Sequence, residues 1–153
     1  MQLNHLAKNR RSRGFTLLEV LVAMVVLSIG LLGLSGLQTS SLRNNHSAFL
    51  RSQATLVSND IIDRMRANRD SAINGDYDIA YAATPTSSTC TSGCSASDVA
   101  DVDLGEWRSY VERLPAGEGE IAYDATDGAI EVKVRWGDAR DGTQLEIVTR
   151  AAL

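Results

Sequence analysis

The sequence predicts an α+β fold in which a long N-terminal helix, apolar in its first half, packs on a small antiparallel β-sheet. Three observations lead to this prediction: an uninterrupted apolar run over residues 15–37, an apolar stripe with helical spacing over residues 50–65, and an alternation of apolar and charged residues over residues 130–136. The stripe and the alternating strand each present one apolar face, and each face can cover the other. The two patterns therefore belong to one domain.

Composition narrows the class of protein before any motif is considered. The chain has 153 residues, which suits one ordinary domain, and 44% of them are hydrophobic with only 2 prolines, which excludes a disordered or collagen-like chain. A net charge of -4 gives no general reason to bind nucleic acid, and we expect none as a partner. The basic residues gather at the start, because residues 1–14 contain Lys8, Arg10, Arg11 and Arg13 and no acid. Residues 1–14 are therefore predicted to be a basic leader.

Residues 15–37 form the first part of the predicted helix. As a helix, these 23 residues cover about 34 Å, more than the roughly 30 Å hydrocarbon core of a bilayer. The basic residues before the run predict a cytoplasmic N-terminus, with the rest of the chain in the periplasm of a Gram-negative cell. The run is longer than the apolar part of a secretory signal, and no Ala-x-Ala site ends it, so we expect no ordinary signal-peptide cleavage. A plain single-pass anchor is one interpretation of such a run.

Glu19 is the single ionisable residue of this run. A charged side chain inside a membrane-spanning helix costs about 2.5–3.5 kcal/mol near the centre and less near the interface. Glu19 therefore needs a positive partner, and no other residue of the run supplies one. The partner must come from another chain or from a new amino group made by cutting this chain nearby.

The residues around Glu19 resemble the type III signal of prepilins and pseudopilins. The resemblance rests on the stretch Arg13-Gly14-Phe15-Thr16-Leu17-Leu18-Glu19 between the basic leader and the apolar run. It implies a pilin-like fold, and it implies that prepilin peptidase cuts between Gly14 and Phe15 on the cytoplasmic face and methylates the new Phe15 amine. It further implies that Glu19, fifth in the processed chain, pairs with the N-terminal amine of a neighbouring subunit in a helical fibre.

Other parts of the chain resemble minor pilins of the PilV type. The resemblance lies in the Gly-spaced apolar segment, in Asp63-Arg64-Met65-Arg66-Ala67-Asn68, and in Trp107 with Leu114-Pro115 and the glycines at 117 and 119. Most major pilins have a proline in the apolar segment that helps the helix melt locally in the fibre, and this chain has none there. Gly30, Gly33 and Gly36 weaken the helix by up to about 1 kcal/mol each relative to alanine, so they favour either local melting or close helix packing.

Residues 38–70 are predicted to continue the helix as a periplasmic stalk. The apolar stripe consists of Leu50, Ala54, Val57, Ile61 and Met65. Asn68, Asp70 and the pair Asn74-Gly75 signal the end of the helix, which gives it about 55 residues from Phe15. So long a helix requires that its second half pack against a head, and residues 71–153 are predicted to form that head.

The head is predicted to begin with a polar loop over residues 82–98 that holds Cys90 and Cys94, the 2 cysteines of the chain. An even count in an oxidising periplasm favours a structural disulfide over free thiols. The spacing is not the CxxC of redox enzymes. The two thiols and His46 are too few for a four-ligand zinc site, and we expect no metal or other cofactor.

A short helix and three strands are predicted to follow. Asp103 and Glu106 have capping-box spacing, and the apolar face Leu104, Trp107, Val111 and Leu114 leads to a helix end at Pro115. Strands are predicted over residues 120–123, 130–136 and 143–150, with Trp136 in the core. The connections between them are of hairpin length, so the sheet should be an antiparallel meander.

The sequence contains no HExxH, GxSxG or glycine-rich phosphate loop that would indicate an enzyme. The prediction of function therefore rests on the resemblance. We expect the protein to be a substrate of prepilin peptidase and not itself an enzyme. The resemblance implies a minor pilin that acts with other minor pilins and the major pilin to prime type IV pilus assembly, with roles in twitching motility and adhesion. Its place would be the inner membrane first and the pilus afterwards. A minor pseudopilin of type II secretion and an unpolymerised, membrane-tethered sensor or binding domain are the alternatives.

Overall fold

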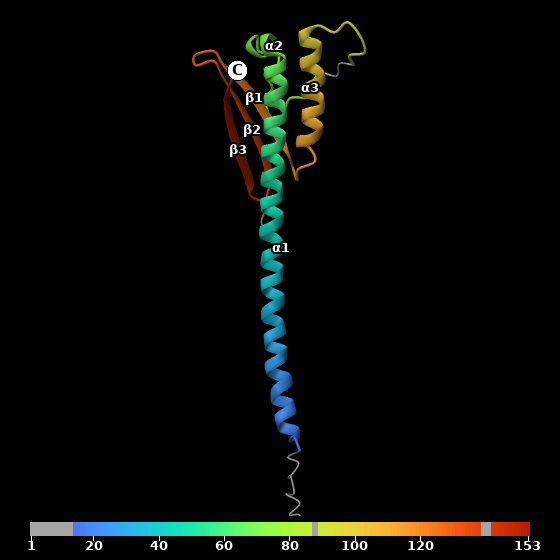
Figure 1. Cartoon of the computed structure of the whole chain (residues 1–153), viewed down its shortest axis with the longest axis vertical. Coiled ribbons are helices and arrows are strands. Elements are labelled where there is room, and N and C mark those ends of the chain that lie inside the picture. Colours follow the sequence, from blue (N-terminus) through green and yellow to red (C-terminus); the bar gives the residue numbers. More distant parts are fainter. Residues whose placement is uncertain (1–13, 87–88, 139–141) are drawn as a thin grey trace, which may run out of the picture. The chain divides into compact units, whose positions relative to one another are not determined.

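The computed structural model describes residues 14–86, 89–138 and 142–153, so all of the predicted leader except Gly14 lies outside the described residues. The elements, in chain order, are α1 (Leu17–Ala67), α2 (Arg69–Ile73), α3 (Ala96–Val111), β1 (Glu118–Asp124), β2 (Ala129–Gly137) and β3 (Gln144–Ala152) (Figure 1). The predicted α+β fold is confirmed. The chain divides into two compact units, Met1–Ser41 and Leu42–Leu153, and α1 contributes to both.

The described part of the first unit is the apolar beginning of α1. Every side chain from residue 14 to residue 41 is exposed, so the described residues leave this apolar surface uncovered. By length and composition, α1 is suited to cross a membrane. The helix continues through Gly30, Gly33 and Gly36, and a Cβ at any of them would meet nothing within 4 Å. Local melting and close packing at these glycines both stay predictions.

The second unit begins with the remainder of α1, and the predicted stripe provides its buried face. The buried residues of α1 are Leu50, Ala54, Ser58, Ile61, Ile62 and Met65. Val57 is half-buried against the same core. Ser58 lies on this face outside the predicted stripe, and its hydroxyl donates a hydrogen bond to the Ala54 carbonyl at 2.9 Å. This bond satisfies the buried hydroxyl, which would otherwise destabilise the core.

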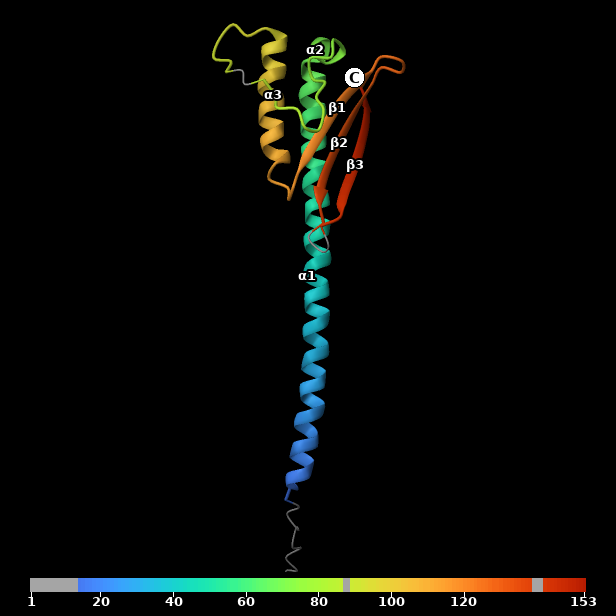
Figure 2. The same ribbon diagram turned by 180° about the vertical axis from the view of Figure 1, so that it is seen from behind.

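The sheet is the predicted antiparallel meander, with strand order β1-β2-β3. The inward residues of β2 are Ile130, Val132, Val134 and Trp136, each at most 1% exposed. They share one core with the buried face of α1 and with Trp107 of α3. Within this unit, Figures 1 and 2 show α3 on one side of α1 and the sheet on the other. The predicted position of Trp136 in the core is confirmed.

The predicted start of α3 at Asp103 is wrong. The helix begins at Ala96 with Ser95 as its N-cap, eight residues before the predicted N-cap Asp103, and Asp98 is the matching acid of the capping box. The main chain of Asp98 donates to the Ser95 hydroxyl at 3.2 Å, and that of Ser95 donates to the Asp98 carboxylate at 2.9 Å. The helix also ends at Val111, before the predicted stop at Pro115. Asp103 has a different role, described below.

Replacing Ser95 by alanine should destabilise the head by about 1 kcal/mol, because the first turn of α3 loses its cap. The hydrogen bonds from the Ser95 hydroxyl and main chain lower the pKa of Asp98 below its ordinary value. The stabilising effect of the Asp98 carboxylate is therefore present above its unfolded pKa and is lost as the pH falls through its folded pKa. Thermal unfolding of the full chain in detergent, at neutral and at acid pH, measures both effects. Equal stability of S95A and wild type at neutral pH would contradict the cap.

Candidate functional site

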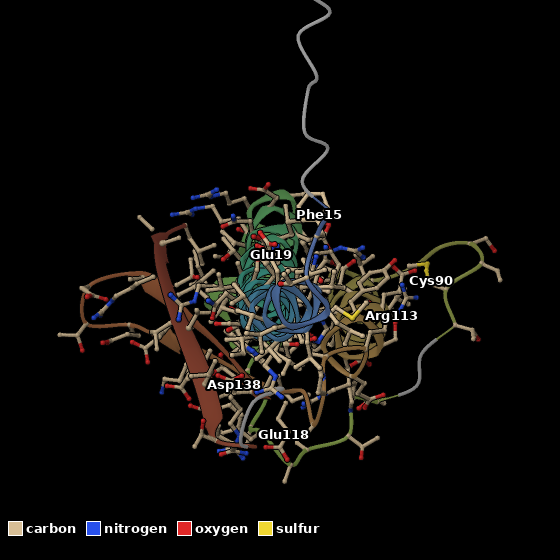
Figure 3. The ribbon with its side chains drawn as sticks, turned by 90° about the horizontal axis from the view of Figure 1, so that it is seen from below. Phe15, Glu19, Cys90, Arg113, Glu118 and Asp138 are labelled. Atoms are coloured by element: carbon tan, nitrogen blue, oxygen red, sulfur yellow. A yellow bond between two sulfur atoms is a disulfide. The ribbon has the colours of Figure 1, made fainter. Side chains whose placement is uncertain are left out.

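The residues of the predicted processing signal lie at the beginning of α1, and Figure 3 labels Phe15 and Glu19 there. Gly14, Phe15 and Thr16 precede the helix, whose first residue is Leu17. The Glu19 main-chain N–H donates to the Thr16 hydroxyl at 3.3 Å and to the Thr16 carbonyl at 3.1 Å. Thr16 is thus the N-cap of α1. The bond between Gly14 and Phe15 lies outside the helix.

Glu19 is exposed in the first turn of α1, where a negative charge is favoured by the helix dipole. Ala23 and Leu27 follow Glu19 at spacings of four and share its face of the helix, and Phe15 lies four residues before Glu19, just ahead of the helix. The small side chain of Ala23 leaves space beside the carboxylate, and a shallow apolar hollow of about 490 Å³ borders Phe15, Glu19, Ala23 and Leu27. A group from another chain can approach the Glu19 carboxylate there.

Arg64 connects α1 to α3 in the head. Its guanidinium donates to Asp103 at 3.0 Å and to Glu106 at 2.7 Å, and it also bonds Asp60 one turn earlier at 2.9 Å. Partial burial would lower the pKa of Arg64, but the hydrogen bonds to Glu106 and Asp103 raise it. Asp103 and Glu106, predicted to cap a helix, therefore serve as the carboxylates that hold α3 against the stalk.

Tyr77 and Asn68 extend this network to the end of α1. The Tyr77 hydroxyl donates to the second carboxylate oxygen of Asp103 at 2.7 Å and accepts from the Asn68 side chain at 3.2 Å. Asn68 also donates to the Ala96 carbonyl at 2.7 Å, at the start of α3. Burial and the hydrogen bond to Asp103 raise the pKa of Tyr77. The stretch 63–68 singled out by the resemblance thus has a structural role in the head.

Arg108 is a buried arginine that the sequence analysis did not identify. Its guanidinium donates to the carbonyls of Ala80, Tyr81 and Ala83 at 2.8–3.1 Å and so fixes the segment after Ile79 to α3. Burial lowers the pKa of Arg108. These carbonyl groups belong to a segment outside the named helices and strands, and they give the buried guanidinium the hydrogen-bond acceptors that a buried charge requires.

Cys90 and Cys94 form the predicted disulfide, with their Cα atoms 5.8 Å apart. Figure 3 labels Cys90 on the loop that leads to α3. The bond closes a small ring just before the N-cap Ser95, so it restricts the chain where α3 begins. Among the described residues, no group of three or more histidine, cysteine or acidic residues could hold a metal ion.

Taken together, these features describe a chain with a membrane-suited apolar helix and a head that has its own apolar core and polar network. Residues 9–35 match the family described as the prokaryotic N-terminal methylation motif, and residues 36–105 match the family described as type IV pilin Tt1218. These matches support a type IV pilin, which implies processing by prepilin peptidase and assembly with other pilins. Neither the curated proteins nor the solved structures gave a match.

Proposed function

We propose that the chain is a minor pilin of the PilV type that helps to prime type IV pilus assembly, with consequences for twitching motility and adhesion. The observation that carries the proposal is the exposed apolar beginning of α1 with its single carboxylate. Lipid chains can cover the apolar surface of this helix, but the hydrocarbon core of a bilayer supplies no cation for Glu19. A second pilin supplies both apolar cover and, once processed, an amine.

The proposed site consists of the scissile bond between Gly14 and Phe15, the Phe15 amine and the Glu19 carboxylate. Hydrolysis of the bond leaves a carboxylate on Gly14 and an amine on Phe15 that is protonated at neutral pH, and N-methylation keeps its charge. The amine of one subunit then pairs with Glu19 of its neighbour. The open hollow beside Ala23 gives this amine a path to the carboxylate.

Processing is tested by the mass of the protein isolated from membranes. We expect a chain that begins with N-methylated Phe15, because the exposed bond before it is the proposed substrate. An unprocessed chain would instead support an unpolymerised membrane-tethered sensor or binding domain. A non-reduced sample also shows the Cys90–Cys94 disulfide as a loss of two hydrogens.

The choice between pilus and type II secretion is tested by deleting the gene. The methylation motif, which the chain matches over residues 9–35, fits a component of either fibre. For a minor pilin, we expect the deletion to remove surface pili and twitching motility and to leave secretion of exoproteins intact. Intact pili with a loss of secretion would contradict the pilus assignment and favour a minor pseudopilin.

A further inference from the structure

Thr16, two residues after Gly14, fixes the position at which α1 begins. The Thr16 carbonyl accepts the Val20 N–H at 3.3 Å, and its hydroxyl accepts the Glu19 N–H at 3.3 Å. The sequence Thr16-Leu17-Leu18-Glu19 also has the residue types and spacing of a capping box. Both observations assign the helix start to Thr16.

An earlier start would change the chemistry of the bond before Phe15. Gly14 is itself an acceptable N-cap residue, so a helix beginning at Phe15 is the nearest competing structure. In that helix, the Gly14 carbonyl would accept the Leu18 N–H, because each helical carbonyl bonds the N–H four residues later. The carbonyl that water must attack would then be hydrogen-bonded within a helical turn. Cleavage of a segment that opens and closes rapidly follows the population of its open form.

We propose that Thr16 is a positioning residue for processing: by capping α1, it keeps the peptide bond between Gly14 and Phe15 outside the helix and open to prepilin peptidase. The inference rests on the proposed function, since it requires that this bond be the one cut. The reaction is a hydrolysis in which the bond between the Gly14 carbonyl carbon and the Phe15 nitrogen breaks. Water supplies the hydroxyl to Gly14 and the proton to Phe15. Thr16 takes no part in this exchange and acts through the backbone conformation alone.

The test compares variants of the full-length chain in membranes that contain prepilin peptidase, with the rate of appearance of the chain starting at Phe15 as the readout. Thr16→Val keeps the shape and β-branch of threonine but removes the cap acceptor. We expect slower cleavage, by up to about five-fold, because the loss of about 1 kcal/mol lowers the ratio of the helix capped by Thr16 to the helix beginning at Phe15 by that factor. Thr16→Ser and Thr16→Asn keep a cap acceptor and should be cut at the wild-type rate. Equal rates for T16V and wild type would overturn the inference, as would equally slow cleavage of T16V, T16S and T16N.

A second measurement reports the conformation directly. In detergent micelles, the ¹³Cα chemical shift of Phe15 should move toward helical values in T16V and stay at the wild-type value in T16S. An unchanged shift in T16V overturns the inference. If the wild-type chain is not cut at Gly14–Phe15, both the proposed function and the inference are wrong. If the wild-type chain is cut there and T16V is cut equally fast, only the inference is wrong.

Discussion

Replacing Glu19 by glutamine should reduce incorporation into pili at least tenfold while leaving insertion in the membrane intact. The change acts on both sides of the equilibrium between membrane and fibre. In the membrane, it removes a charge whose cost is about 2.5–3.5 kcal/mol near the bilayer centre and smaller near the interface. In the fibre, it leaves the neighbouring amine without its counter-charge, and removing one partner of a buried ion pair costs about 3–5 kcal/mol. Since about 1.4 kcal/mol corresponds to a factor of ten, a fraction of these energies suffices for the expected tenfold loss of incorporation.

The measurement is the amount of protein in sheared pili relative to the membrane, with the N-terminus of both fractions determined by mass spectrometry. Glu19→Asp retains the charge and should retain much of the incorporation. Leu18→Gln is the matched control, because it introduces the same amide at the neighbouring exposed position while Glu19 remains. Wild-type amounts of processed E19Q in pili would contradict the proposed pairing of the carboxylate with an amine.

The sequence could predict those elements whose pattern of apolar and polar residues lies within one short stretch of the chain. The apolar run over residues 15–37 predicts a helix by its length, and the alternation from Ile130 to Trp136 predicts a strand by its period; α1 and β2 confirm both predictions. The face formed by Leu104, Trp107, Val111 and Leu114 is likewise buried. The spacing of these four residues puts them on one face whichever residue begins the helix.

The start of α3 could not be predicted because two capping boxes compete in the sequence. Ser95 with Asp98 and Asp103 with Glu106 have the same spacing, and local chemistry does not separate them. Tertiary contacts decide between them, since Arg64 and Tyr77 donate hydrogen bonds to the Asp103 carboxylate, which therefore does not cap the helix. Arg108 was missed for a related reason. Its partners are main-chain carbonyls 25 to 28 residues away, which no side-chain pattern reveals.

The proposed processing signal differs from the helix start at Ser95 and from Arg108, because its proposed partners lie outside the chain. In the structure, Phe15 just before α1 and Glu19 in its first turn are both exposed, and the described residues up to residue 41 give Glu19 no cation, in agreement with the sequence. A peptidase, a methyl donor and a neighbouring subunit would complete the proposed site. Residue chemistry predicted the need for a partner, and only an experiment on the fibre can identify it.

Substituting Gly119 by alanine should destabilise the head by about 2–3 kcal/mol, the upper part of the range for an overpacked core. A Cβ on Gly119 would lie 2.9 Å from Cζ2 and 3.2 Å from Cζ3 of Trp107, and closer still to Cη2. Trp107 is fully buried, so its ring cannot move aside without displacing the rest of the core. Alanine at position 119 therefore has no space unless the core around Trp107 rearranges.

The measurement is thermal unfolding of the full chain in detergent, followed by the near-ultraviolet circular dichroism of the 2 tryptophans. For a head of this size, the loss corresponds to a fall in Tm of about 10 °C. Gly105→Ala is the matched control, because a Cβ there meets nothing within 4 Å and alanine favours the helix, so Tm should stay or rise. Trp107→Phe shortens the ring, so the double variant with G119A should lose less stability than the two single losses added together. Strict additivity would show that the strain lies elsewhere than between Gly119 and the Trp107 ring.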